Sequence, residues 1–391
     1  MSIKTATNDF CKTPLFEAYY NDDIEQFLKL INDGENINCH DEHGRSLIST
    51  IICNNKNDFS SNKEYFDALI ANNVWIGHDN TNRGLLSVAI LNQKNTYYAR
   101  ELLKNKIDVN SFGKFIFPVY SENSEIISYG PPIFDAVLFN RTEYIDLFFE
   151  YNFDIDICDN ENRTILNYFI SCAAVNDDKS IQMFKRFIDY GADMDMLDND
   201  GANILGTIVK WKKYYLLETL FDKMSHVDIN HRDVAGRTPL MSAVYNRDIN
   251  IVKFLIKKGA NLNAYEMNGN NALILAVISG KIDVFKLLID SGADILSVNK
   301  NRKGESKTGN TILHELVETE CIYFTNTSTH KLLYEYYEII LKKHPELLSI
   351  KNNLGKTPID ILKSKNNFCE KRRAFFDQFK SKNNSSYDKT R

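Results

Sequence analysis

The stretch Asp233-Val-Ala-Gly-Arg-Thr-Pro-Leu-Met-Ser-Ala-Val244 returns 33 residues later as Glu266-Met-Asn-Gly-Asn-Asn-Ala-Leu-Ile-Leu-Ala-Val277. The segments that follow, 251–261 and 284–294, match at the same offset and share a Gly-Ala ending. Self-similarity at a fixed period of a few tens of residues is typical of arrays in which one small unit is stacked many times. The sequence therefore predicts an array of short units rather than the two or three globular domains that 391 residues would otherwise suggest.

Each unit is predicted to contain two helices. Thr238 can cap the first helix through its hydroxyl, and Pro239 is tolerated in the first helical turn. The leucines at 287–288 lie on the expected buried stripe of the second helix. The glycines that we expect to end second helices in a left-handed conformation are Gly191, Gly259 and Gly292. Because one helix pair cannot bury its apolar face alone, neighbouring pairs must stack.

This pattern resembles the ankyrin repeat, in which D-x-x-G-x-T-P-L-H-x-A is followed by V-x-x-L-L-x-x-G-A-D/N. Residues 233–298 carry it nearly whole, and weaker copies extend along most of the chain. The anchors that correspond to T-P-L are Thr13-Pro14-Leu15, Ser46-Leu47, Leu85-Leu86, Pro132-Ile133, Ile165-Leu166, Ile204-Leu205, Pro239-Leu240, Ala272-Leu273, Ile312-Leu313 and Thr357-Pro358-Ile359. The resemblance implies an all-α ankyrin-repeat solenoid of about ten helix-turn-helix repeats with short hairpin fingers. The family's His after T-P-L is kept only as His314, where it is expected to make structural hydrogen bonds.

The predicted domain organisation is a single solenoid over residues 1–362. Its most regular repeats span 233–298, and the repeats in 1–232 and 299–362 are degenerate. Residues 363–391 carry nine Lys/Arg and three Asp/Glu, which leaves a net charge of −11 for 1–362. We expect a basic amphipathic helix over 363–380 that caps the last repeat, since solenoid ends need a polar cover. A membrane-surface helix and a nuclear-localisation signal at 371–373 are alternatives for this segment, and 381–391 is predicted to be disordered.

The largest departure from the period lies at 111–130, before a first helix, where it would lengthen a finger. Its aromatic residues are Phe112, Phe115, Phe117, Tyr120 and Tyr129. Two interpretations fit: the rings cover the adjacent helices, or they contact a partner, because aromatic side chains are enriched at binding hot spots.

Composition and motifs exclude several classes of function. A net charge of −5 gives no sign of nucleic-acid binding, and no apolar run is long enough to span a membrane. The N-terminal residues have no apolar core, so no signal peptide is expected. The seven dispersed cysteines without a C-x-x-C pair favour a reducing cytoplasm.

The Gly355-Lys-Thr357 triplet is explained by its place in the last repeat, and the tip 40–43 is expected to be solvated rather than to bind metal. We therefore expect no enzyme and no catalytic, cofactor or metal site.

The resemblance implies a protein-binding module that uses finger tips and first helices, and the chain is expected to be monomeric alone. The candidate contact residues, placed by repeat register, are His231, Arg232 and Val234 on one tip, Tyr265 and Met267 on the next, Tyr245 on a first helix, and Phe115, Phe117 and Tyr120 in the long finger.

The biological role has two candidate readings. A degenerate array of this kind is similar to ankyrin proteins of intracellular bacteria or large DNA viruses, which implies an effector delivered into a host cytoplasm. The alternative is an intracellular inhibitor or immunity protein that neutralises a toxin or host factor, for which the acidic body favours a basic partner.

Overall fold

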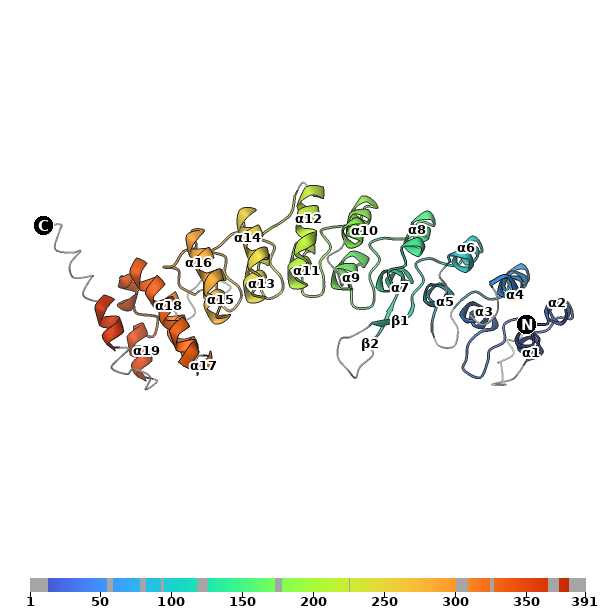
Figure 1. Cartoon of the computed structure of the whole chain (residues 1–391), viewed down its shortest axis with the longest axis horizontal. Coiled ribbons are helices and arrows are strands. Elements are labelled where there is room, and N and C mark those ends of the chain that lie inside the picture. The colour runs from blue at the N-terminus through green and yellow to red at the C-terminus, as the bar shows by residue number, and fades with distance from the viewer. Residues whose placement is uncertain are drawn as a thin grey trace. The chain divides into compact units, whose positions relative to one another are not determined.

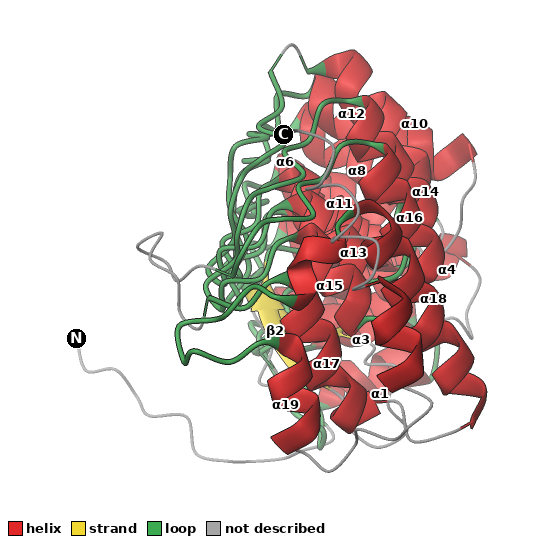
Figure 2. Ribbon diagram, turned by 90° about the vertical axis from the view of Figure 1, so that its left-hand side faces the viewer, coloured by secondary structure: helices red, strands yellow, loops and turns green. Residues whose placement is uncertain are grey.

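The computed structural model describes residues 13–54, 59–77, 82–92, 95–117, 126–172, 178–224, 226–299, 309–323, 327–364 and 373–379. These residues form helix pairs joined by loops, with one two-stranded hairpin (Figure 1). The chain divides into two compact units, one of residues 1–175 and 186–193 and the other of residues 176–185 and 194–391. Within each unit, the finger loops project from the side of the first helices (Figure 2).

The first unit contains four complete helix pairs and most of a fifth. They are α1 (Pro14–Tyr20) with α2 (Ile24–Asn32), α3 (Leu47–Cys53) with α4 (Phe59–Ala71), α5 (Leu85–Asn92) with α6 (Tyr97–Lys104), α7 (Ile133–Leu138) with α8 (Thr142–Glu150), and α9 (Ile165–Cys172) with α10 (Asp178–Asp189). Helix α10 contributes residues to both units.

The second unit continues the alternation of first and second helices. Its elements are α11 (Ile204–Lys210) with η1 (Tyr214–Leu216) and α12 (Leu217–Lys223), α13 (Pro239–Tyr245) with α14 (Ile249–Lys257), α15 (Ala272–Ile278) with α16 (Ile282–Asp290), α17 (Ile312–Tyr323) with α18 (Thr327–Lys343), then η2 (Pro345–Leu348) and α19 (Pro358–Ser364). Residues 373–379 are also helical.

The predicted helix ends are confirmed. The Thr238 hydroxyl accepts a hydrogen bond from the Met241 amide at the start of α13, and Pro239 occupies the first helical turn. Gly259 and Gly292 follow α14 and α16 with φ of +88° and +94°. These values lie in the left-handed region, where a side chain is disfavoured.

The core forms by stacking within each layer. In the first unit α5 packs on both α3 and α7, and in the second α13 packs on both α11 and α15. Aromatic rings fill the space between layers: Tyr65 of α4 packs edge-on against Tyr19 and Phe27 at 5.1 and 4.9 Å between ring centroids. All three rings are fully buried. Burial of this kind supplies the main stabilisation, since a single pair has no core of its own.

The long insertion forms a β-hairpin, as its position in a finger predicted. Strand β1 (Gly113–Phe117) pairs antiparallel with β2 (Ile126–Gly130), and Gly113 lies opposite Gly130. The Tyr129 backbone exchanges two hydrogen bonds with Asn160 of the next finger, both 2.9 Å long. Phe112 and Tyr129 are exposed. Tyr120 lies outside the described residues, as do the side chains of Phe115 and Phe117.

His314 has the structural role that its place after the T-P-L position predicts. It is fully buried, its Nδ1 lies 2.8 Å from the Thr311 hydroxyl, and its Nε2 lies 3.0 Å from the Lys356 carbonyl. Burial lowers the pKa of this imidazole. The ring therefore ties α17 to the loop before α19.

The C-terminal helical segment packs on α18. Phe375 and Phe376 meet Tyr334 and Tyr337 at 4.8 and 5.1 Å between centroids, and Phe376 is buried. The single solenoid over 1–362 and the capping helix over 363–380 stay predictions, and 381–391 lies outside the described residues. In the described part of the chain, no helix is both long enough and apolar enough to cross a membrane.

Candidate protein-binding groove

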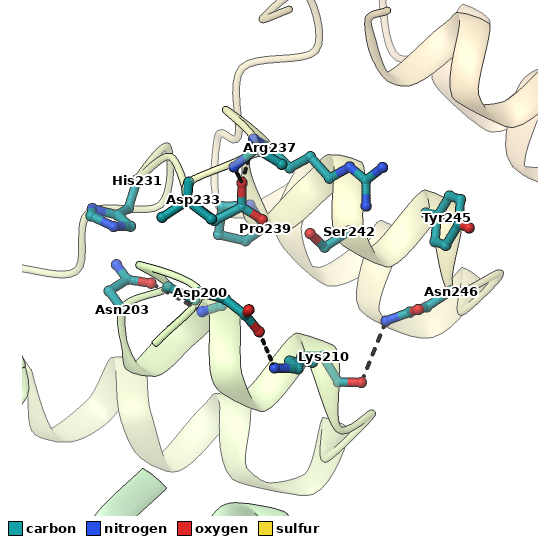
Figure 3. A pocket seen from close by; sticks show the side chains of 14 residues that line it. Asp200, Asn203, Lys210, His231, Asp233, Arg237, Pro239, Ser242, Tyr245 and Asn246 are labelled. Carbon is teal, nitrogen blue, oxygen red and sulfur yellow. Dashed lines mark hydrogen bonds and ion pairs between the residues drawn. The ribbon is translucent and has the colours of Figure 1, made fainter. Parts of the chain in front are cut away.

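A groove of about 310 Å³ lies in the second unit, between the finger at 228–237 and the first helices α11 and α13 (Figure 3). Its lining residues are Asp200, Ala202, Asn203, Gly206, Lys210, His231, Asp233, Val234, Ala235, Arg237, Pro239, Ser242, Tyr245 and Asn246. They come from two successive repeats, so the groove exists only because the repeats stack.

Small residues keep the groove open on its α11 side. A Cβ atom added to Gly206 would stand 2.9 Å from the Ala202 Cβ, closer than side chains normally approach. The chain therefore has no room for a larger residue at position 206 without local movement. Pro239 and Ser242 line the α13 side, where Figure 3 shows Ser242 on the helix between Pro239 and Tyr245.

Hydrogen bonds hold the finger in one conformation. Asp233 Oδ1 accepts from the amides of Ala235 and Arg237 at 2.9 and 2.8 Å. The Val234 amide donates to the Asp200 carbonyl of the preceding finger at 2.8 Å, and the His231 Nε2 lies 2.7 Å from the Gly201 carbonyl. Because the finger is braced before any partner arrives, binding would cost little ordering entropy.

The finger bases are linked by a ladder of Asn and Asp side chains that the sequence analysis missed. Asn230 Oδ1 accepts from the Asn261 amide at 2.8 Å, and Asn263 Oδ1 accepts from the Asp294 amide at 2.9 Å. In the first unit Asn110 accepts in the same way from Asp154 at 3.0 Å. The signal was the recurring pattern of Asp or Asn two residues apart after the Gly-Ala position, and it accounts for part of the 44 asparagines in the chain.

The charged groups at the groove are paired in specific ways. Lys210 of α11 forms an ion pair with Asp200. Arg237 donates from Nε to Glu266 Oε2 at 2.9 Å, and its guanidinium lies 4.9 Å from the centre of the Tyr245 ring. A cation over an aromatic face is attracted to it. The pairings leave the groove with charges of both signs and an aromatic ring held in place.

Two exposed apolar side chains flank the groove. Val234 at the finger tip is 62% exposed, and Tyr245 at the end of α13 is 54% exposed. Exposed apolar groups beside a braced concave surface are the usual anchors of protein recognition.

Eight of the nine candidate contact residues fall into three places, and Tyr120 lies outside the described residues. His231, Val234 and Tyr245 line the groove together. The Arg232 side chain donates to the Tyr265 carbonyl of the next finger, where Tyr265 and Met267 are half-buried. Phe115 and Phe117 lie on β1 of the first unit. The sequence analysis did not name Asp200, Asn203, Lys210, Arg237, Ser242 or Asn246.

The described residues provide no metal site: no group of three or more His, Cys, Asp or Glu side chains among them could hold an ion. At the tip 40–43, His43 lies 3.6 Å from Glu42, and both side chains are mostly exposed. The most perturbed acid is Asp135 of α7, where burial raises the pKa to about 7. It lies in the first unit, apart from the groove residues.

Comparison with known proteins agrees with the repeat pattern. Residues 170–266 and 213–299 match the family model described as ankyrin repeats in three copies. Residues 170–299 therefore match ankyrin repeats. A solved structure, the ankyrin repeat domain of Bcl-3, described as a unique member of the IkappaB protein family, is similar at 20% identity with a TM-score of 0.47, over 59% of this chain and 92% of that chain. A search of curated proteins found no match.

The ankyrin match and the helix pairs confirm the predicted fold class, an all-α ankyrin-repeat solenoid. Ankyrin repeats, matched over residues 170–299, indicate a protein–protein interaction scaffold.

Proposed function

We propose that this protein binds a protein partner through the groove between α11, α13 and the finger at 228–237, without catalysing a reaction. The observation that carries the proposal is that Val234 and Tyr245, both exposed, line a groove whose walls are already held by hydrogen bonds. Such a surface presents apolar anchors without first having to reorganise.

The groove suits an apolar side chain of the partner with polar atoms on either side. Pro239, Val234 and the Tyr245 ring offer apolar contact, while the Asp200–Lys210 pair and Arg237 offer charge. Anchors of this kind contribute most of the affinity, and the surrounding charges favour the correct partner and orientation. Tyr265 and Met267 of the next finger are proposed to extend the contact. Phe115, Phe117 and Tyr120 in the long finger of the first unit stay separate candidate contact residues.

The test begins with a partner identified by photo-crosslinking from position 234 in the native cell. The double variant Val234→Ala/Tyr245→Ala should then bind it at least about tenfold more weakly, because each truncated anchor costs more than about 1 kcal/mol. Tyr20→Ala is the matched control, since Tyr20 is an exposed aromatic at the end of first helix α1 in the other unit. Full-strength binding by the double variant would mean that the groove is not the contact face.

The biological role that we propose is that of an effector delivered into a host cytoplasm. It rests on the degenerate array and on the basic, polar segment 363–391. A translocation assay compares the whole chain with a variant that lacks residues 362–391. Unchanged delivery, or no delivery of either form, counts against an effector with a C-terminal signal.

The alternative is an intracellular inhibitor or immunity protein, which the charge of −11 over residues 1–362 favours for a basic target. Binding of a basic target should weaken steeply as salt rises, because long-range attraction is screened over about 8–10 Å at physiological ionic strength. Affinity measured at low and high salt separates this candidate from a partner held mainly by apolar contacts.

A further inference from the structure

A second groove, of about 610 Å³, lies on the outer layer of the second unit between α12 and α14. Figure 1 shows these two helices as neighbours in that layer. The second helices α14 and α16 pack against each other, as α2 and α4 do, but α12 and α14 approach each other less closely. The groove therefore lies where two neighbouring second helices make little direct contact.

The starts of the two second helices that flank the groove differ. Before α14, Asp248 caps the helix by accepting from the amides of Asn250 and Ile251 at 3.1 Å. Lys213 occupies the corresponding place before the second helix of the preceding repeat, and its side chain makes no capping hydrogen bond. A lysine has no acceptor with which to cap a helix. The first turn of this second helix is the 3-10 helix η1, and α12 itself spans only Leu217–Lys223.

The floor of this groove is aromatic. The Phe254 ring lies 6.2 Å from that of Tyr214 and 5.4 Å from that of Phe221, both edge-on. Lys258 places its Nζ 4.7 Å from the centre of the Phe221 ring. Tyr214 is exposed, so part of the floor is open to a ligand.

The two walls carry opposite charges. Glu218 and Asp222 lie one turn apart on α12, and Lys253 and Lys257 lie one turn apart on α14. All four side chains are exposed, and within the described chain none of them has an ion-pair partner. Like charges four residues apart slightly destabilise a helix. The arrangement thus costs a little helix stability without forming a bond inside the chain.

We propose that this outer groove binds an amphipathic helix of a protein partner. Its apolar stripe would lie on Tyr214 and Phe254, with basic residues along one flank toward Glu218 and Asp222 and acidic residues along the other toward Lys253. Helices α12 and α14 have 7 and 9 residues, or about 10 and 13 Å at 1.5 Å per residue, which matches about two helical turns.

A helical occupant fits better than an extended one. Both walls are helices whose backbone groups already bond internally, so an extended segment would find no backbone partners in the groove. A helix satisfies its own backbone and offers charged side chains at the same four-residue spacing as the walls. This surface is separate from the concave groove of the proposed function, and its test does not depend on that function.

The probe is a labelled alanine-rich helical peptide of about 20 residues, long enough to hold a helix in water. It carries a leucine stripe between an arginine flank and a glutamate flank. Fluorescence anisotropy measures its binding to the full chain. We expect the variant Lys253→Glu/Lys257→Glu to bind this peptide at least about fivefold more weakly than the natural chain, because it loses two exposed ion pairs.

A second peptide with arginine on both flanks should show the reverse preference and bind the variant better than the natural chain. The matched control is Lys179→Glu/Lys185→Glu, which makes the same charge change on exposed residues of α10. Circular dichroism verifies that both variants are folded.

Three outcomes would overturn the proposal. The mixed-charge peptide fails to bind the natural chain, or both double variants bind it equally, or sedimentation shows a dimer of this chain that Lys253→Glu/Lys257→Glu dissociates. In the last case a second copy, rather than a partner helix, fills the groove.

Discussion

Two finger loops with the same spacing of acid and arginine hold the arginine differently. In the first unit, Arg163 Nε donates to Asp159 Oδ2 of its own finger at 2.7 Å. In the second unit, Arg237 stands at the same distance in sequence from Asp233, but its Nε donates to Glu266 of the next finger at 2.9 Å. The first arrangement closes a finger on itself, and the second joins two fingers.

The difference determines what each finger can offer to a partner. The Asp159 side chain is fully buried beneath its arginine, so this finger is a closed structural unit. Asp233 keeps only the backbone amides of its own turn, and Arg237 is displaced to the groove beside Tyr245. A finger that shares its arginine with the next repeat thus gains a charged group at its binding surface and couples the two repeats.

The largest expected effect breaks the closed finger. Asp159→Ala removes the acceptor of the amides of Glu161 and Arg163. It also leaves the mostly buried Arg163 guanidinium without the Asp159 carboxylate to balance its charge. We expect a loss of about 3–5 kcal/mol in the free energy of unfolding, as for other broken buried pairs. Asp233→Ala loses two backbone bonds and should cost about 1–2 kcal/mol. Urea unfolding of both variants measures the difference, and equal losses would show that the two fingers are held alike.

The next effect concerns a buried acid of the first unit whose hydrogen-bond partner is a hydroxyl rather than an arginine. Burial raises the pKa of Asp135 to about 7, against the weaker opposing effects of the Ser87 hydrogen bond and the Arg83 charge. Between about pH 4 and pH 7 the folded chain holds a proton that the unfolded chain has lost, so stability falls as pH rises through this window and then levels off.

Asp135→Asn should remove this fall and stabilise the protein by about 4 kcal/mol at pH 8, at about 1.4 kcal/mol for each of about three pKa units. The asparagine keeps an acceptor for Ser87 and carries no charge. Urea midpoints at pH 5 and pH 8 test it, with the exposed Glu35→Gln as the control in the same unit. A midpoint difference that Asp135→Asn leaves unchanged would show that another group titrates.

The sequence predicted the fold because the repeat signal depends on local chemistry. The hydroxyl of Thr238 and the left-handed freedom of Gly259 act within one turn of the chain, so their roles follow from neighbouring residues alone. The same holds for His231, Val234 and Tyr245, which repeat register placed on the finger and the first helix before the groove was seen.

The remaining features depend on residues in the next or the preceding repeat. The choice of Arg237 between Asp233 and Glu266 requires knowing which acid comes within reach when two fingers stack. Asp200 and Lys210 line the groove but belong to the preceding, degenerate repeat, whose spacing departs from 33 residues, so repeat register did not place them there. The outer groove depends on how α12 and α14 from successive repeats lie beside each other, which the sequence of one repeat alone does not show.

A double-mutant cycle sharpens the comparison by measuring the bond between fingers. Glu266 is 2% exposed and Arg237 is partly exposed. We therefore expect a coupling energy of about 1–2 kcal/mol from the unfolding free energies of Glu266→Ala, Arg237→Ala and the double variant. The same cycle on Asp233 and Arg237 should give a coupling near zero. A larger coupling to Asp233 would mean that the arginine returns to its own finger in solution.

The smallest effect belongs to a bond between repeats that is exposed on both sides. Nη1 of Arg100 in α6 lies 2.8 Å from Oε2 of Glu150 in α8, and the two side chains are 42% and 53% exposed. Solvent screens such a pair, so Arg100→Ala should cost at most about 0.5–1 kcal/mol. The loss should vanish at about 1 M salt, where screening acts over about 3 Å, while the coupling of Arg237 to buried Glu266 should persist. If both couplings fell equally as salt rises, burial of the acid would not explain the difference between the Arg237–Glu266 bond, which joins two fingers, and the Arg100–Glu150 bond, which bridges two surface helices.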